Sequence, residues 1–341
     1  MAFNFIDSFD AYPNINDSSN GLQGYYSVYN QYGDMSIGTG RFGGQCITVN
    51  GYINGNNGQF TKGIPSTNTF TVGFATRMNQ FITGTTDYTF QYNTCGGNSI
   101  GVQMNANQQY QIYFNSTVLA VAPNFISVGS WHFLELEVSI NSSTGFANLY
   151  VDGLLQASFT GNTGNSPCTS VGWGLFNAQD YLHTTNHSYD DVYVKNVATR
   201  EGERKVQALV PASDYSLQWL PSTGTTHYSL INTLPVPASP STYVYANVAT
   251  YQDLYGVTSL SNSPSVVSCV QIRTCAAKDQ AETKTIATVI DSAGTIVDGT
   301  TYALTASYLY YTDIYDNDPH TGGAWNKDTV NALKIGQKVI S

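Results

Sequence analysis

The most regular alternation of hydrophobic and polar residues lies between residues 131 and 153. In its first half every second residue is aliphatic: Leu134, Leu136, Val138 and Ile140. A period of two is typical of a β-strand, so this set is expected to form one buried face. Residues 141–145 have the small polar side chains and the glycine of a hairpin loop, and a second strand-like run follows at residues 146–151. The pattern predicts a β-hairpin at the centre of a sheet.

Short runs of the same kind recur along the chain, each bounded by Gly, Asn, Ser or Thr. Before residue 198 they cover residues 3–10, 41–49, 69–78, 89–92, 99–104, 110–114, 116–121, 158–164, 170–176 and 188–194. After residue 214 they cover residues 242–249, 266–276, 283–290, 301–304 and 307–314. Near the C-terminus, Asn326 or Asp328 is a candidate cap for a short helix that runs through Lys334 and ends at Gly336. We predict an all-β protein, with two jelly-roll-like β-sandwich domains in tandem and one short C-terminal helix.

Length and one cluster of charges predict where the chain divides. A chain of 341 residues usually forms more than one domain. Residues 198–214 hold a dense charge cluster followed by Pro211, which is typical of an inter-domain segment. We predict a jelly-roll domain at residues 1–197, a charged linker at 198–214 and a second β-sandwich domain at 215–341. The linker is expected either to contact a neighbouring subunit, through residues 200–205, or to be solvated.

Charge and hydropathy exclude several classes of function. The formal net charge is −10, and residues 1–197 hold four Lys or Arg against eleven Asp or Glu. Neither half has a basic stripe for phosphates, so no nucleic acid is expected as a partner. No apolar run approaches the roughly 18 residues of a membrane helix, so no membrane insertion is expected. The N-terminus lacks the basic start and hydrophobic block of a secretory signal, which predicts folding in a cytoplasm.

Cysteine usage agrees with a reducing compartment. The five cysteines are an odd number without a CxxC pair, which favours buried free thiols over disulfides or a zinc site. Cys269 and Cys275 lie on one predicted strand, where a rise of about 3.3 Å per residue separates them too far for a disulfide.

Glu135 and Glu137 are the one close pair of acids on a predicted strand, and residues two apart share a face. Retaining glycosidases hold two carboxyls about 5 Å apart, and jelly-roll β-glucanases carry them in the pattern Glu-x-Asp-x-x-Glu. Here Ile140 stands where the last acid of that pattern should be. We therefore predict no catalytic residues, and expect both glutamates on a solvated strand face.

Asp10, Asp190 and Asp191 are candidate ligands of a structural calcium ion. Asp190 and Asp191 open the predicted closing strand, while Asp7 and Asp10 lie on the opening strand. The first and last strands of a jelly roll commonly pair, and calcium prefers carboxylate and carbonyl oxygens. The alternative is a strand edge whose acids are solvated. No other cofactor is expected.

Tyrosines gather in two places. Tyr25, Tyr26, Tyr29 and Tyr32 lie in an Asn- and Gly-rich stretch, and Tyr308, Tyr310, Tyr311 and Tyr315 crowd one late strand. Such clusters either stack on sugars or line subunit interfaces and cover sheet edges. In a protein with so few charges we favour subunit interfaces.

Several of these stretches together resemble known families. Residues 41–45, 131–138, 145–153 and 189–194 resemble a concanavalin A-like or laminin-G-like jelly roll. The second half is similar to a family of tailed-bacteriophage virion proteins, in which such a jelly roll precedes a second β domain. The motifs that carry this similarity are residues 206–211, 218–224, 251–255, 318–325 and 330–336, with Tyr228, Ile231 and Asn232.

The resemblance covers nearly the whole chain and implies a role. It implies a non-catalytic structural protein on the exterior of the phage particle, at the tail and its fibres or decorating the capsid. The expected partners are other virion proteins and further copies of the chain, and the expected location is the virion, after assembly in the host cytoplasm. One alternative is a tail lectin that recognises a host-surface glycan, and a second is a polysaccharide depolymerase.

Overall fold

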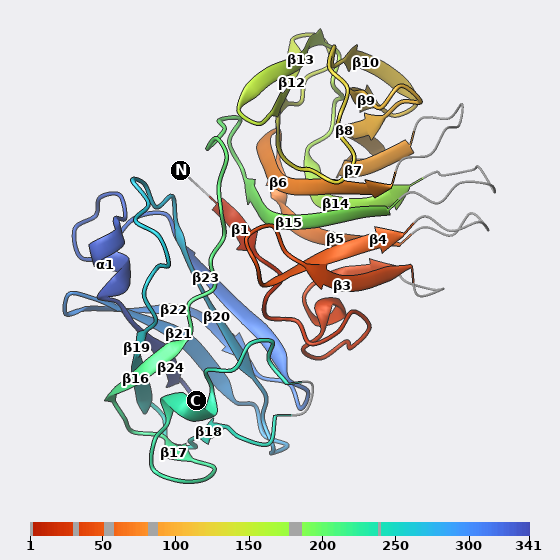
Figure 1. The fold of residues 1–341 in the computed structure, drawn as a ribbon. Coiled ribbons are helices and arrows are strands. Elements are labelled where there is room, and N and C mark those ends of the chain that lie inside the picture. The colour runs from red at the N-terminus through yellow and green to blue at the C-terminus, as the bar shows by residue number, and fades with distance from the viewer. Residues whose placement is uncertain (1–2, 30–33, 51–57, 81–87, 177–185, 238–239) are drawn as a thin grey trace. The chain divides into compact units, whose positions relative to one another are not determined.

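The computed structural model describes residues 3–29, 34–50, 58–80, 88–176, 186–237 and 240–341. Regular structure there is almost entirely antiparallel β-strand, with one short α-helix and two 3-10 turns (Figure 1). No helix in these ranges is long and apolar enough to cross a membrane. The chain folds into two compact units, residues 1–10, 14–16 and 26–206, and residues 11–13, 17–25 and 207–341. The predicted all-β fold class is confirmed.

The first unit is a sandwich of two antiparallel sheets. One sheet has the order β13-β12-β11-β6-β15-β4-β3, with β1 paired to β15. Its strands are β1 (Phe3–Asp7), β3 (Met35–Thr39), β4 (Gln45–Asn50), β6 (Thr69–Gln80), β11 (Trp131–Ser139), β12 (Gly145–Val151), β13 (Leu154–Gly161) and β15 (Asn186–Lys195). The other sheet has the order β10-β9-β8-β7-β14-β5-β2. Its strands are β2 (Ser27–Tyr29), β5 (Gln59–Thr67), β7 (Tyr88–Cys95), β8 (Asn98–Met104), β9 (Tyr110–Phe114), β10 (Thr117–Val121) and β14 (Cys168–Phe176).

Aromatic side chains from both sheets fill the space between them. Phe60 of β5 stacks on Trp173 of β14 with 5.5 Å between ring centroids. Phe60 also meets Tyr189 of β15, on the opposite sheet, edge-on at 5.8 Å. All three side chains are completely buried, and aromatic burial of this kind stabilises the sandwich by the hydrophobic effect and by ring geometry.

The hairpin predicted from residues 131–153 is present as β11 and β12. Leu136 pairs with Leu149, and on its other side with Val72 of β6. The predicted aliphatic face is buried, because Leu134, Leu136 and Val138 have no exposed surface. The opening strand β1 also pairs with the closing strand β15, as the sequence predicted.

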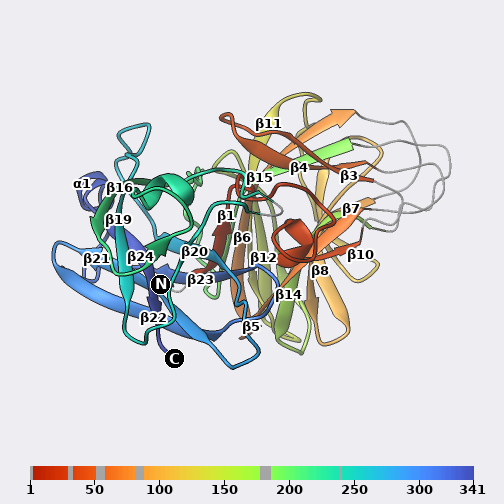
Figure 2. The ribbon, with the colours of Figure 1, turned by 90° about the horizontal axis from the view of Figure 1, so that it is seen from below.

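The second unit is built on a five-stranded sheet of order β16-β19-β24-β21-β22. Its strands are β16 (Pro211–Ser216), β19 (Gln252–Val257), β21 (Thr285–Ser292), β22 (Thr295–Ala303) and β24 (Lys334–Val339). Two small sheets complete it, β17 (Leu220–Pro221) with β18 (Val244–Tyr245), and β20 (Val270–Ala276) with β23 (Leu309–Tyr315). Strands β20 and β23 lie beside the large sheet (Figure 2).

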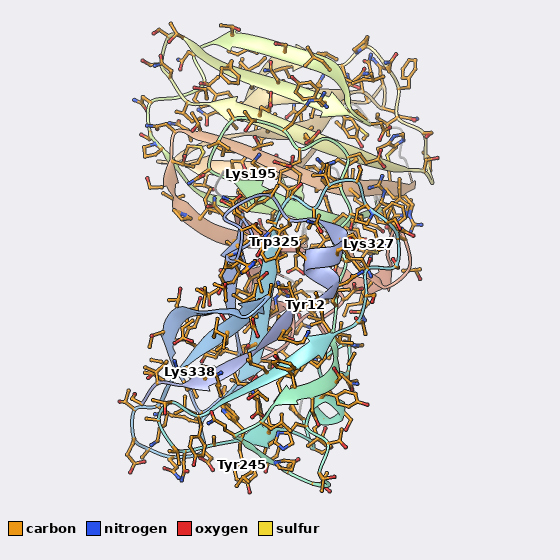
Figure 3. The ribbon with its side chains drawn as sticks, turned by 90° about the vertical axis from the view of Figure 1, so that its left-hand side faces the viewer. Tyr12, Lys195, Tyr245, Trp325, Lys327 and Lys338 are labelled. Atoms are coloured by element: carbon orange, nitrogen blue, oxygen red, sulfur yellow. A yellow bond between two sulfur atoms is a disulfide. The ribbon has the colours of Figure 1, made fainter. Side chains whose placement is uncertain are left out.

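Trp325 anchors the core of the second unit. It is 2% exposed and lies in a cluster with Ile272, Ile290, Val330 and Leu333. Its indole Nε1 donates a 2.8 Å hydrogen bond to the carbonyl of Tyr315, and it lies next to α1 (Lys327–Asn331) (Figure 3). Trp325 is therefore a packing residue of the second unit.

The C-terminal helix is shorter than predicted. Asn326 caps α1, and its side chain accepts hydrogen bonds from the backbone of Asp328 and Thr329. The prediction that the helix runs through Lys334 to a glycine cap is wrong, because residues 334–339 form strand β24. Gly336 lies between β19 and β21, and a Cβ there would lie 1.8 Å from the carbonyl oxygen of Asp253. The pairing of β24 with both β19 and β21 therefore outweighs the local sequence pattern that predicted a helix.

Two N-terminal segments belong to the second unit. Residues 11–13 and 17–25 depart from the first unit and pack with strands β20 and β23. Arg273 of β20 stacks over the ring of Tyr25 at 4.5 Å and donates a 2.9 Å hydrogen bond to the hydroxyl of Tyr12. Tyr310 of β23 donates to the carbonyl of Asn20 at 2.6 Å. The domain boundaries predicted at residues 197 and 215 place residues 11–13 and 17–25 in the first domain, but these residues belong to the second unit.

One disulfide corrects the cysteine prediction. Cys95 and Cys168 are bonded, because β7 and β14 pair with these two residues directly opposite each other. They are 73 residues apart in the chain, so their proximity depends on a strand pairing that the spacing of cysteines does not reveal. Cys46, Cys269 and Cys275 form no disulfide, as predicted, but only Cys46 is fully buried.

Candidate functional site

Glu135 and Glu137 of β11 do not lie on a solvated face. Glu135 is 1% exposed. Its Oε1 accepts hydrogen bonds from the hydroxyl of Tyr193 at 2.5 Å, from the backbone N–H of Glu201 at 2.9 Å and from that of Gly202 at 2.8 Å. The expectation of a solvated strand face is wrong, because a later segment of the chain covers both glutamates.

That segment, residues 199–206, is called the strap below. Glu137 accepts a 2.8 Å hydrogen bond from the backbone N–H of Arg200, and Lys195 forms a 2.5 Å ion pair with Glu201. At the far end of the strap, Val206 donates its N–H to Asp191 at 2.7 Å. The strap is the first half of the predicted linker, and it belongs to the first unit.

This geometry gives the two glutamates a structural role, because they hold the strap against strand β11. A glycosidase acid must reach the glycosidic oxygen, and its partner must reach the sugar ring or a water. Glu135 is instead enclosed by Tyr193 and the strap, and its charge is matched by N–H donors. A buried carboxylate of this kind fixes the backbone groups that donate to it. Loss of a donor would leave part of a buried charge without a partner, which is costly.

Asp10, Asp190 and Asp191 gather around the loop of residues 40–45. Asp10 accepts a 2.8 Å hydrogen bond from the N–H of Gln45, and Asp190 accepts a 2.7 Å bond from the N–H of Arg41. The loop passes so close that a Cβ on Gly44 would lie 2.2 Å from Oδ1 of Asp10. The structure therefore brings the three predicted aspartates to one place.

Burial is the dominant influence on this aspartate cluster. Desolvation, and then the charge of Asp191, raise the pKa of Asp190 to about 8. Desolvation also raises the pKa of Asp191, although Arg41 lies 3.7 Å from its Oδ2. That Oδ2 atom is buried and accepts no hydrogen bond. The surroundings of Asp190 and Asp191 thus disfavour their ionised forms, and the nearby N–H groups and Arg41 offset this only in part.

The fit of these residues to calcium is incomplete. Among the described residues, no three His, Cys, Asp or Glu side chains are arranged as a metal site. The oxygen of Asp191 without a donor is the one atom here that a cation would satisfy. Calcium at Asp10, Asp190 and Asp191 stays a prediction.

Three tyrosines of the two predicted clusters are buried inside the chain. Tyr26 is 3% exposed in the first unit, and Tyr310 and Tyr311 are 9% and 7% exposed in the second. Tyr12, Tyr25 and Tyr310 surround Arg273, with the Tyr12 and Tyr310 rings edge-on at 5.5 Å. This burial leaves Tyr26, Tyr310 and Tyr311 little surface for a subunit interface, whereas Tyr29 is 42% exposed. Tyr25, Tyr308 and Tyr315 are partly buried, and Tyr32 lies outside the described residues.

The face of the seven-stranded sheet opposite Phe60 and Trp173 carries an uncharged row, in which Tyr92 is partly buried and Tyr113 is buried. Directly paired residues of antiparallel strands share a face, and Thr61, Gly172, Tyr92, Gly101 and Tyr113 are paired in this order across five strands. The ring of Tyr92 covers Gly172, where a Cβ would lie 2.3 Å from Cε1. Partial burial raises the pKa of Tyr92 to about 12, so this ring stays neutral.

The second unit exposes an apolar surface on β17, β18 and the segment after them. Leu220 pairs with Tyr245, and the Tyr243 and Tyr245 rings lie 6.2 Å apart. These three side chains, with Val248 and Tyr251, are 37–56% exposed. We call these five residues the 220–251 surface; Tyr245 is labelled in Figure 3.

Asp253 fixes the backbone behind the 220–251 surface. Its Oδ1 accepts from the N–H groups of Gln218 and Trp219 at 2.7 and 2.8 Å. Its Oδ2 accepts from the hydroxyl of Tyr255 at 2.7 Å and lies 2.7 Å from Nδ1 of His227. Sequence reasoning missed this carboxylate, although it lies within residues 251–255, one of the motifs that resembled phage proteins.

Comparison with known proteins gives only distant likenesses. No family model and no curated protein matches the chain. Among solved structures, "Cellulose induced protein, Cip1" is 16% identical and covers 55% of this chain and 98% of its own, with a TM-score of 0.43. An alginate lyase of polysaccharide lyase family 7 is 10% identical, with coverages of 55% and 92% and a TM-score of 0.38. A sialidase is 10% identical, with coverages of 57% and 18% and a TM-score of 0.38.

Proposed function

We propose that this protein is a non-catalytic structural subunit on the exterior of a tailed-bacteriophage particle, and that the 220–251 surface binds a neighbouring virion protein. The observation that carries the proposal is the position of this surface. Two of its residues, Leu220 and Tyr251, lie in the motifs at residues 218–224 and 251–255 that resemble phage virion proteins, and its Leu220 and Tyr245 side chains are about half exposed. We further propose that the chain assembles in the host cytoplasm and remains in the virion.

The chemistry of the surface suits a permanent contact. Leu220, Tyr243 and Tyr245 are apolar or aromatic, and such side chains supply most of the free energy of interfaces when they are buried. Asp253 holds the backbone at Gln218 and Trp219, so little conformational entropy is lost on binding. A rigid apolar surface of this kind supports a structural role.

Incorporation into particles tests this proposal. Phage lacking the gene would be complemented with wild-type protein, with Leu220→Lys, or with Val266→Lys, which changes an equally exposed residue of the second unit. We expect Leu220→Lys to reduce the protein in purified particles by about tenfold or more, because a buried lysine replaces an interface anchor. Val266→Lys should incorporate normally. Absence of the wild-type protein from particles would refute the proposal.

A second candidate function is glycan recognition by the first unit, and the Tyr92 row favours it. Tyr92 is partly buried and lies between Gly172 and Gly101 on the paired strands, and it is the type of aromatic side chain on which sugar rings stack. Binding of the isolated protein to immobilised host-surface polysaccharides tests this function. Loss of binding in Tyr92→Ala, with retention in Tyr245→Ala, would support it, and absence of wild-type binding would contradict it.

A further inference from the structure

The two most exposed large apolar side chains in the described part of the chain, Phe125 and Leu154, lie at one end of the first unit. Phe125 is 71% exposed, Leu154 is 66% exposed and its neighbour Leu155 is 55% exposed. Phe125 follows strand β10, and the two leucines begin strand β13. A 2.8 Å hydrogen bond from Asn124 to Gln156 joins the two segments. We call these three side chains the edge patch.

The edge patch lies where both sheets of the sandwich end. Strand β13 is the last strand of one sheet and β10 is the last of the other, and the two strands are neighbours (Figure 1). Proteins usually protect free edges with charges, prolines or very short strands. In the second unit, edge strand β22 carries Asp298, paired with Lys338, and edge strand β16 begins at Pro211. The eight residues of β13 contain neither a charge nor a proline.

The absence of charge extends well beyond the strand. Residues 88–131 and 153–179 contain no Asp, Glu, Lys or Arg, in a chain whose formal net charge is −10. Two charged side chains, Asp152 in the turn before β13 and Arg200 of the strap, contact this turn and its neighbours. Asp152 lies 2.7 Å from Nδ1 of His132, and Arg200 donates a 3.0 Å hydrogen bond to the carbonyl of Gly153.

We propose that the edge patch binds the edge patch of a second copy of this chain, related by a two-fold axis. The distribution of charge favours a second copy of the chain over a basic partner. A basic partner would gain most on the acidic surface of the protein, whereas two copies with the same net charge repel each other least where the contact surface is uncharged. A two-fold contact also requires a self-complementary surface, and an uncharged apolar patch meets this requirement.

Apolar side chains carry the contact, because backbone pairing along β13 is interrupted. The register of β12 and β13 shifts between Leu149 and Tyr150, so β13 has an extra residue opposite this point. A bulge of this kind bends an edge strand and limits continuous pairing with another strand. Phe125, Leu154 and Leu155 project beside it and remain available to a partner.

This inference deepens the proposed structural role, because it names a second copy as one neighbour, but it concerns the isolated protein in solution. Sedimentation of the full-length chain over a range of micromolar concentrations measures its association. We expect a monomer–dimer equilibrium that strengthens at higher salt, since salt screens the repulsion between acidic copies. Leu154→Asp should weaken the dimer by at least about tenfold, or about 1.4 kcal/mol.

Val266→Asp is the matched control, since Val266 is 54% exposed but lies in the second unit. Phe125→Cys provides an independent readout that does not depend on a destabilising charge, because two-fold contact predicts a covalent dimer after mild oxidation. A wild-type protein that stays monomeric at all concentrations would overturn the inference. So would a dimer that Leu154→Asp and Val266→Asp weaken equally. A dimer in solution without incorporation into particles would uphold this inference and refute the virion role.

Discussion

The hydroxyl of Tyr193 reaches Oε1 of Glu135 across an intervening strand. Glu135 lies on β11 and Tyr193 on β15, and both pair with Gly73 of the strand between them, β6. A Cβ on Gly73 would lie 2.0 Å from the Tyr193 ring, so the glycine makes room for the 2.5 Å hydrogen bond. The carboxylate and the hydroxyl then hold the strap on the outer face of the sheet.

Glu135→Gln should release the strap from strand β11. The substitution removes the charge that three donors share, and we expect the free energy of unfolding to fall by about 1.5–3 kcal/mol. Urea unfolding measures this loss, and hydrogen exchange should show faster exchange at residues 200–202. Glu282→Gln, at an exposed position of the second unit, should leave both measurements unchanged. Slow exchange in Glu135→Gln would mean that the strap is held by other contacts.

Reduction of the Cys95–Cys168 disulfide should destabilise the first unit. The bond closes a loop of 73 residues, for which chain entropy predicts a contribution of about 4 kcal/mol at most. Thermal unfolding with and without reductant checks this, and Cys95→Ser with Cys168→Ser should remove the effect of the reductant. Alkylation of the unreduced, unfolded chain should label Cys46, Cys269 and Cys275 only. Labelling of all five cysteines would contradict the bond.

Local patterns predicted the parts of the fold that depend on local chemistry. The period of two in residues 134–140 identified β11, and Asn326 was one of two candidate helix caps. Patterns failed where a distant segment decides the outcome. Nothing near Glu135 indicates that the strap will cover it, and nothing near Gly336 indicates that β19 and β21 will pair on both sides of it.

The candidate sites were likewise predictable where they depend on local patterns and unpredictable where a distant segment decides the contact. Pairing of the first and last strands was predictable, so Asp10, Asp190 and Asp191 were placed together correctly. The hydrogen bonds of Asp253 join residues 218–227 to β19 across an irregular loop, which no periodicity reveals. The packing of residues 17–25 with the second unit could not be predicted from local sequence either, because their contact Arg273 lies about 250 residues further along the chain.

Arg273→Met should detach residues 17–25 from the second unit. The guanidinium stacks over Tyr25 at 4.5 Å and donates to Tyr12 at 2.9 Å, and such contacts contribute about 1–3 kcal/mol together. Hydrogen exchange should become faster at residues 17–25, while strand β21 remains protected. Arg273→Lys keeps the charge but loses the planar group, so it should restore only part of the protection. Unchanged exchange in Arg273→Met would contradict this role.

Stability should fall as the pH rises from about 6.5 to about 8, in a buffer that contains a chelator. The pKa of Asp190 is raised from 3.8 to about 8 in the folded state, so folding favours its protonated form and this contribution is lost as the pH rises through the folded pKa. The slope is at most about 1.4 kcal/mol per pH unit for one proton. His187, whose pKa burial lowers from 6.5 to about 4, acts with the opposite sign only below this window. Asp190→Asn should flatten the profile, and a flat wild-type profile would contradict the assignment.

Calcium should reverse this pH dependence if it binds at Asp10, Asp190 and Asp191. A divalent cation favours the ionised carboxylates, so the stability added by calcium should grow as the pH rises from 6.5 to 8. At a calcium concentration one hundred times the dissociation constant, the gain is about 2.7 kcal/mol. Thermal unfolding with calcium, with magnesium and with a chelator measures it. Asp191→Asn should abolish the gain, because it replaces the buried oxygen that accepts no hydrogen bond. A melting temperature that is unaffected by calcium would show that these aspartates act by holding Arg41 and Gln45 of the adjacent loop.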